Sequence, residues 1–288
     1  MNRSGYSLLL ASLAFAAASL VAQPPAVGGK GKGGAPKAGA TVEKIRTLKP
    51  NLYLITGGGA NTLVRVTPEG IIVVDTKNPG DDNYNRVMEE IRTVSPLPVK
   101  WVINTQHHPD HVGTNQKFID AGAQVVAVAP LKAFMESDPR TKDIPGRPQV
   151  TFAKDYALKF GGAEVQAHFY GPGHSGGDTI VYFPAEKIVM IGDQMSDTTP
   201  IIDFANGGSL KTWNNSLDGA LKMDFEFAIP GRGEPKTKAE VQAFRDKIAT
   251  LMQRAADAAK SGATTIDTSD LGWQFQPAAI GSMIAEMK

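Results

Sequence analysis

The six residues QHHPDH at positions 106–111 constrain this chain more strongly than any other part of its sequence. They hold three of the five histidines among its 288 residues. They follow an apolar stretch at 101–105 that is typical of a strand, and they precede a predicted helix. A loop between a strand and a helix can bring several side chains to one point without disturbing the sheet. Because imidazole nitrogens and carboxylate oxygens are ligands that Zn²⁺ accepts, this loop predicts a metal site.

Two later stretches supply further candidate ligands. The first, GPGHSGGD at 171–178, lies between predicted strands, and its glycines allow the backbone to bring His174 close to another group. The second, IVMIGD at 188–193, is an apolar strand that ends in Asp193. A carboxylate at the end of a buried strand needs a partner, and a metal ion is a suitable one.

Apolar stretches of strand length alternate with helical patterns from residue 41 onward, and no second linker interrupts them. We expect strands at 52–56, 61–66, 71–75, 101–104, 123–128, 165–170, 180–183 and 188–191. Apolar residues at helical spacing predict a helix around 87–94, and a capping box at 237–240 predicts the start of another. Strands and helices therefore mix in two successive halves, which favours a layered α/β arrangement with helices outside the sheets.

The N-terminus predicts export. A short basic region that includes Arg3 precedes the uncharged apolar stretch Leu8–Ala22, so we expect a signal peptide at 1–22, with a retained membrane anchor as the alternative. The Gly-, Pro- and Lys-rich stretch 23–40 reads as a disordered linker, and 41–288 as a single domain. The expected location is periplasmic or extracellular. The chain has no cysteine, which excludes disulfides, lipid attachment through cysteine and thiolate metal sites.

Charge limits the class of partner. Positions 1–40 hold four basic residues and no acidic ones, and removing these four from the 30 Lys and Arg leaves 26 basic against 29 acidic residues in 41–288. This balance argues against a nucleic-acid surface. We expect a small-molecule substrate and no stable membrane anchor, while the sequence leaves the oligomeric state open.

In this order and at these intervals, the motifs resemble those of the metallo-β-lactamase superfamily. The resemblance covers roughly residues 45–240 and is carried by Gly58–Thr62, Ile71–Asp75, Asn104–His111, Gly171–His174, Gly192-Asp193 and Pro230–Gly233. It implies an α/β (α+β) fold, a four-layer αββα sandwich, with the site at one edge of the two sheets.

The resemblance also implies a ligand set, from which this chain departs at two positions. The first metal site would hold Gln106, His108 and His174, and the second Asp110 and His111, with Asp193 able to bridge both. The family motif has histidine where this chain has Gln106, and histidine again where it has Arg232.

The two departures weaken the site in different ways. The amide oxygen of Gln106 is a weaker zinc ligand than imidazole, and a guanidinium has only donors and cannot ligate. Arg232 could instead pair with Asp110 or Asp193 and occupy the place of the second metal. We therefore expect a mononuclear site on His108, His174 and Asp193, with Gln106 near it.

The predicted function is that of a secreted metal-dependent hydrolase, in which metal-bound hydroxide attacks an activated carbonyl in a lactam, lactone, thioester or ester. Asp110 would orient the water or shuttle its proton, and Arg232 would bind a substrate carboxylate or stabilise an oxyanion. One zinc ion is favoured over two, and iron and manganese accept the same ligands. The alternative is a metal-poor, non-catalytic binding or structural module on the same fold.

Other polar residues near these motifs have supporting roles. The resemblance implies that Asp75 orients the ligand loop, and Asp178 is expected to anchor the loop at 171–178. His107 either supports the site or is exposed, and His168 is expected to be structural. The irregular segment 195–206 could form a wall of the pocket.

Overall fold

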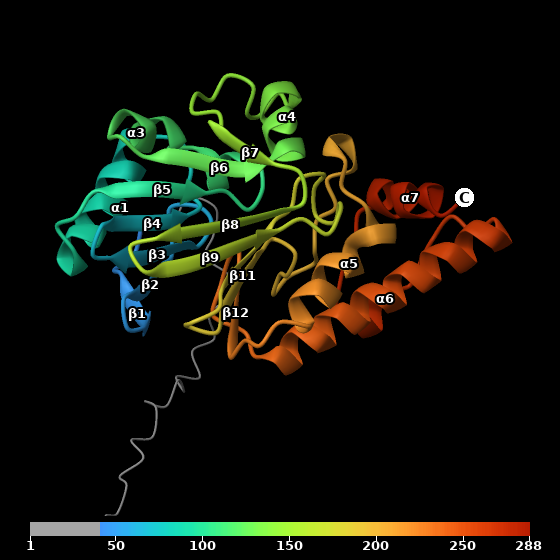
Figure 1. The fold of residues 1–288 in the computed structure, drawn as a ribbon. Helices are drawn as coiled ribbons and strands as arrows, with labels where there is room; N and C mark the ends of the chain where they lie inside the picture. The colour runs from blue at the N-terminus through green and yellow to red at the C-terminus, as the bar shows by residue number, and fades with distance from the viewer. Residues whose placement is uncertain (1–40) are drawn as a thin grey trace, which may run out of the picture. The chain divides into compact units, whose positions relative to one another are not determined.

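Two mixed sheets form the centre of residues 41–288, which are the residues that this computed structural model describes (Figure 1). The strands of the larger sheet are, in spatial order, β1 (Arg46–Lys49), β2 (Leu52–Ile55), β3 (Thr62–Thr67), β4 (Gly70–Val74), β5 (Val99–Ile103), β6 (Gln124–Val128) and β7 (Val150–Phe152). Those of the smaller sheet are β12 (Phe227–Pro230), β11 (Ile188–Gly192), β10 (Ile180–Phe183), β9 (Ala163–His168) and β8 (Asp155–Phe160). Antiparallel pairs predominate, but β4 to β7 run parallel, as do β11 and β12.

Helices pack around the two sheets. They are α1 (Asp81–Val94), α2 (Pro109–Val112), α3 (Asn115–Asp120), α4 (Ala129–Ser137), α5 (Leu210–Leu221), α6 (Lys238–Ser261) and α7 (Pro277–Glu286), with 3₁₀ turns at Phe204–Asn206 and Ser269–Leu271. The predicted capping box opens α6, where Thr237 and Glu240 bond each other's backbone N–H. Within the described residues no helix is long and apolar enough to span a membrane.

Three apolar clusters hold these layers together. One cluster lies between the sheets and joins side chains of both, such as Val126 of β6 and Val165 of β9. A second packs α1 and α3 against the larger sheet, and a third packs α5 and α6 against the smaller sheet. Because β4 touches both the central and an outer cluster, all five of its residues are buried, which explains its lack of alternation. The order helix, sheet, sheet, helix confirms the expected αββα architecture.

The chain positions its polar loops at one edge of the sandwich. β4 and β5 are parallel neighbours, and so are β11 and β12, so the loops at their carboxyl ends gather together. Backbone bonds join the two sheets there: the Asn61 amide donates to the Gly231 carbonyl at 2.7 Å, and the Thr179 amide to the Thr105 carbonyl at 2.7 Å.

Every strand expected from the sequence is present, with its ends shifted by two residues at most. The sequence did not reveal β1, β7, β8 and β12, which are short or carry polar residues on an open face. The predicted signal peptide at 1–22 and linker at 23–40 lie outside the described residues.

Candidate metal centre

Three candidate ligands converge at the shared edge of the two sheets. His108 follows β5, His174 lies in the loop between β9 and β10, and Asp193 follows β11. Nδ1 of His108 lies 3.1 Å from Nε2 of His174, which is 3.5 Å from Oδ2 of Asp193. All three ligand atoms lie within 4.8 Å of one another. The structure therefore brings together the three residues of the expected mononuclear site.

In His108 and in His174, the ring nitrogen that faces away from the other histidine donates to an acceptor; we call it the outer nitrogen. Nδ1 of His174 donates to the Ile201 carbonyl at 2.8 Å, and Nε2 of His108 donates to Oδ2 of Asp203 at 2.8 Å. Each neutral ring then has its lone pair on the nitrogen that faces the other ring. Burial lowers the pKa of His108, which favours this neutral form. Two lone pairs at 3.1 Å need either a shared proton or a cation that accepts both.

The spacing of these atoms fits one metal ion. Ligand atoms about 2.0 Å from a tetrahedral zinc ion lie roughly 3.3 Å apart. The two measured separations, 3.1 and 3.5 Å, are on either side of that value. The ligand side chains are also slightly open to solvent, since those of His108 and Asp193 are 10% and 12% exposed.

Gln106 presents a donor to this site. Its Oε1 accepts from the backbone N–H of His108 at 2.7 Å, while its Nε2 donates to Oδ2 of Asp193 at 3.1 Å. A ligand role, as expected from the sequence, would require the carbonyl to turn toward the ion. In the present arrangement Gln106 instead orients the Asp193 carboxylate.

Arg232 bridges the two carboxylates that would serve a second ion. Its Nη2 donates to Oδ2 of Asp110, and its Nη1 lies 3.3 Å from Oδ2 of Asp193. Gly231 permits this close approach, because a Cβ at that position would lie 1.8 Å from Oδ1 of Asp193. His111 and Arg232 outweigh the effect of burial and hold the pKa of Asp193 well below its usual range. The guanidinium thus supplies a positive charge between the remaining ligands of the second site.

His111 is held between carboxylates. Its Nδ1 lies 2.8 Å from Oδ2 of Asp75, and its Nε2 lies 3.3 Å from Oδ2 of Asp193 and 3.6 Å from Oδ2 of Asp110. Although burial opposes the charged form, the three aspartates raise the pKa of His111 well above its usual range. Asp75 also accepts from the backbone amide of Thr105 at 2.8 Å, which confirms that it orients the ligand loop.

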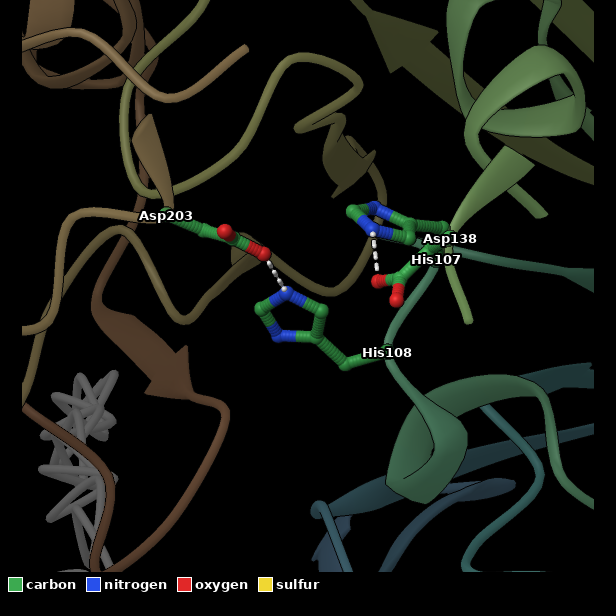
Figure 2. Close-up of side chains that lie close together, drawn as sticks. All are labelled: His107, His108, Asp138 and Asp203. Atoms are coloured by element: carbon green, nitrogen blue, oxygen red, sulfur yellow. Dashed lines mark hydrogen bonds and ion pairs between the residues drawn. The ribbon is translucent and has the colours of Figure 1, made fainter. Parts of the chain in front are cut away.

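A second cluster, made of His107, His108, Asp138 and Asp203, adjoins the site (Figure 2). Nε2 of His107 lies 3.1 Å from Oδ2 of Asp138, and burial lowers the pKa of His107 to about 4. Arg140 donates to both Asp138 and Asp203, so its guanidinium compensates the charge of one of these two carboxylates. His107 is thus a buried supporting residue. Sequence analysis missed Asp138, Arg140 and Asp203, which carry no motif.

The remaining candidates behave as expected. Asp178 accepts from the backbone amide of Ser175 at 2.6 Å and from its hydroxyl at 2.8 Å, and therefore anchors the His174 loop. Burial raises the pKa of Asp178 to about 6. His168 lies outside both clusters and pairs with Asp155 at 2.7 Å.

Comparisons with known proteins identify the family and the fold. The family model of the metallo-beta-lactamase superfamily matches residues 49–232. A metallo-beta-lactamase type 2 of Elizabethkingia meningoseptica is 25% identical over 222 residues, covering 73% of this chain and 87% of the relative. The alpha subunit of a 2,4-dinitroanisole O-demethylase of Nocardioides sp. (strain JS1661) is 26% identical, covering 82% of this chain and 72% of the relative.

Solved structures show the same fold. A metallo-beta-lactamase from Pontibacter korlensis superposes with a TM-score of 0.65 at 20% identity, over 73% of this chain and 99% of that one. The DIM-1 metallo-beta-lactamase gives a TM-score of 0.62 at 19% identity, over 73% and 99% of the two chains. The family model spans well over half of the chain, and the αββα layers agree with it, so this chain belongs to the metallo-β-lactamase superfamily.

Proposed function

We propose that this protein is a metal-dependent hydrolase with one metal ion, held by His108, His174 and Asp193. The observation that carries the proposal is the convergence of two imidazole lone pairs, 3.1 Å apart, beside the carboxylate of Asp193. The proposal is further supported by the family to which the chain belongs. Zinc suits this ligand set, and iron or manganese could replace it.

Arg232 is the reason to favour one ion over two. Two unit charges about 4 Å apart interact by roughly 4 kcal/mol at an effective dielectric near 20, and a divalent ion beside a guanidinium would be repelled more strongly. Asp110 and Asp193 both pair with Arg232, and His111 lies between Asp75 and Asp193. The groups available to a second ion are therefore already satisfied by protein donors.

When bound, the metal would act as a Lewis acid and lower the pKa of a coordinated water toward neutrality. The protein supplies the remaining functions. Asp110 has 13% of its side chain exposed, so its carboxylate can accept a proton from a water molecule at the site. The Arg232 side chain is 37% exposed and can place its guanidinium beside negative charge that develops on a reacting carbonyl oxygen.

The substrate class we propose is an activated carbonyl compound: a lactam, lactone, thioester or ester. Family membership does not choose among them, because one relative is named a metallo-beta-lactamase and another an O-demethylase subunit. We also propose that the protein is exported, on the basis of the apolar stretch at 8–22. Cell fractionation tests export, and protein found only in the cytoplasm would contradict it; N-terminal sequencing of the exported protein tests cleavage, which a start at Met1 would contradict.

Elemental analysis of the purified protein tests the site. We expect about one zinc ion per chain in the wild type, and two in the Gln106→His, Arg232→His double variant, which regains both histidine ligands. His174→Ala should hold none. The matched control is His168→Ala, which removes a histidine outside both clusters and should still hold one ion.

Variants that hold the metal should hydrolyse a chromogenic lactam or an aryl ester, and His174→Ala should hydrolyse neither. Two tightly held ions in the wild type would contradict the mononuclear site. A metal-free, inactive but well-folded wild type would favour the alternative, a non-catalytic module on the same fold.

A further inference from the structure

We propose that Asp203 is a positioning residue for the metal ligand His108, which it holds in the tautomer that presents Nδ1 to the ion. The inference rests on the proposed metal site, but it concerns a residue that belongs to none of the motifs of this chain. Asp203 lies in the segment 201–208, between β11 and α5. Figure 2 shows its carboxylate directed at the outer nitrogen of His108.

The contact is short and shielded. Oδ2 of Asp203 lies 2.8 Å from Nε2 of His108, and the side chains of both residues are only 10% exposed. A carboxylate that is ionised only accepts, so Nε2 of a neutral His108 must carry the proton. The lone pair is then on Nδ1, which faces His174. The opposite tautomer would place a proton on the ligand atom and exclude the metal.

The carboxylate is itself held in place. The guanidinium of Arg140 and the amide of Asn206 both donate to it, the latter at 2.9 Å to Oδ2. Asp203 therefore accepts from His108, Arg140 and Asn206, and these three donors fix the orientation of its carboxylate.

The same segment also holds the second histidine ligand. The Ile201 carbonyl accepts from Nδ1 of His174 at 2.8 Å, and the backbone amide of Asp203 donates to the His174 carbonyl at 2.8 Å. Both histidines are thus oriented by residues within two positions of each other. Such outer partners of metal-bound histidines typically affect metal affinity by 10–100-fold.

The test uses Asp203→Ala, which removes the acceptor, and Asp203→Asn, which retains one carbonyl oxygen. Zn²⁺ affinity is measured by competition with a chromophoric chelator. We expect the dissociation constant to rise about 10–100-fold in Asp203→Ala, with Asp203→Asn between it and the wild type. Asp155→Ala breaks a more exposed His–Asp pair outside both clusters and should leave the affinity unchanged.

A second measurement separates positioning from general destabilisation. Side-chain ¹⁵N NMR of the metal-free wild type should show His108 as a single tautomer with its proton on Nε2, and Asp203→Ala should show a mixture. Circular dichroism establishes that each variant is folded, and Asp203→Asn serves if Asp203→Ala does not fold.

Different results would overturn the role of Asp203 and the proposed metal site. A wild type that binds Zn²⁺, together with an equally tight Asp203→Ala variant or a wild-type His108 proton on Nδ1, would overturn the role of Asp203 alone. A wild type that takes up no Zn²⁺ would overturn the metal site and the role of Asp203 together.

Discussion

Lys77 lies next to the site and has none of its surface exposed. Its Nζ donates to the carbonyls of Ile55 at 2.8 Å and Ala60 at 2.6 Å. Two acceptors match the two N–H groups of a neutral amine, whereas an ammonium group has three donors. Burial lowers the pKa of Lys77 to about 7, against the raising influence of Asp75, Glu43 and Asp110.

This buried amine predicts how stability depends on pH. An unfolded lysine has a pKa near about 10.4, so between roughly pH 7 and 10 the unfolded state binds more protons than the folded state. The contribution of Lys77 to the free energy of unfolding should therefore rise with pH in this window, by up to about 1.4 kcal/mol per pH unit, and level off below pH 7. Lys77→Met should lose this slope.

Urea unfolding of the wild type and Lys77→Met at several pH values from 7 to 10 measures the difference. The control is Lys260→Met, which replaces an exposed lysine of α6. Its free energy of unfolding should depend on pH in the same way as that of the wild type. A constant difference between the wild type and Lys77→Met would mean that Lys77 is charged in the folded protein.

At the scale of elements, α7 supports the start of α5. The carboxylate of Glu286, the last residue of α7, accepts from the backbone amides of Leu210 at 2.9 Å and Lys211 at 3.4 Å. A negative charge is favourable at a helix N-terminus, where amides lack partners within the helix. α5 begins directly after the segment 201–208, so the C-terminal helix helps to hold the segment that orients both histidines.

Glu286→Ala should therefore destabilise the protein locally. We expect a loss of about 1 kcal/mol in the free energy of unfolding, because two amides lose their acceptor. Amide hydrogen exchange at Leu210 and Lys211 should become faster than in the wild type. Glu234→Ala, which removes an exposed carboxylate that pairs with Arg46, is the control for charge. Unchanged exchange in Glu286→Ala would mean that water replaces the carboxylate at no cost.

At the scale of the whole molecule, the candidate metal joins the two sheets. His108 lies in the loop after β5 of the larger sheet, whereas His174 and Asp193 lie in loops that follow β9 and β11 of the smaller sheet. An ion bound to all three acts only in the folded state and stabilises it by mass action, by about 2.7 kcal/mol at a free concentration one hundred times the dissociation constant.

Removing the metal should accordingly lower the melting temperature. For a protein of this size, a loss of about 1 kcal/mol in the free energy of unfolding lowers Tm by roughly 2–4 °C. A chelator added at that free metal concentration should therefore lower Tm by about 5–10 °C. Differential scanning calorimetry with and without the chelator measures the shift. His174→Ala should show none, and an equal shift in that variant would assign the stabilisation to metal bound elsewhere.

Many of the strands and helices could be predicted from the sequence because their determinants are local, whereas the four-layer αββα order was predicted from the family resemblance. The buried strands β4 and β11 are continuous apolar stretches, and α6 has its own capping box. Strands β8 and β12 are different, because polar or partly exposed residues interrupt their pattern and only pairing with a neighbour defines them. Local pattern cannot reveal an element that tertiary contacts stabilise.

The sequence by itself determined which groups are available: His108, His174 and Asp193 as candidate ligands, and Arg232 where the family motif has a histidine. Only the tertiary structure decided how they are used. It turned the donor of Gln106 toward Asp193, set Arg232 between two aspartates, and brought Asp203 to His108 across 95 positions of the chain. Residue type limits which bonds a side chain can make, but the direction of each bond depends on partners that only the packed sheets bring within reach.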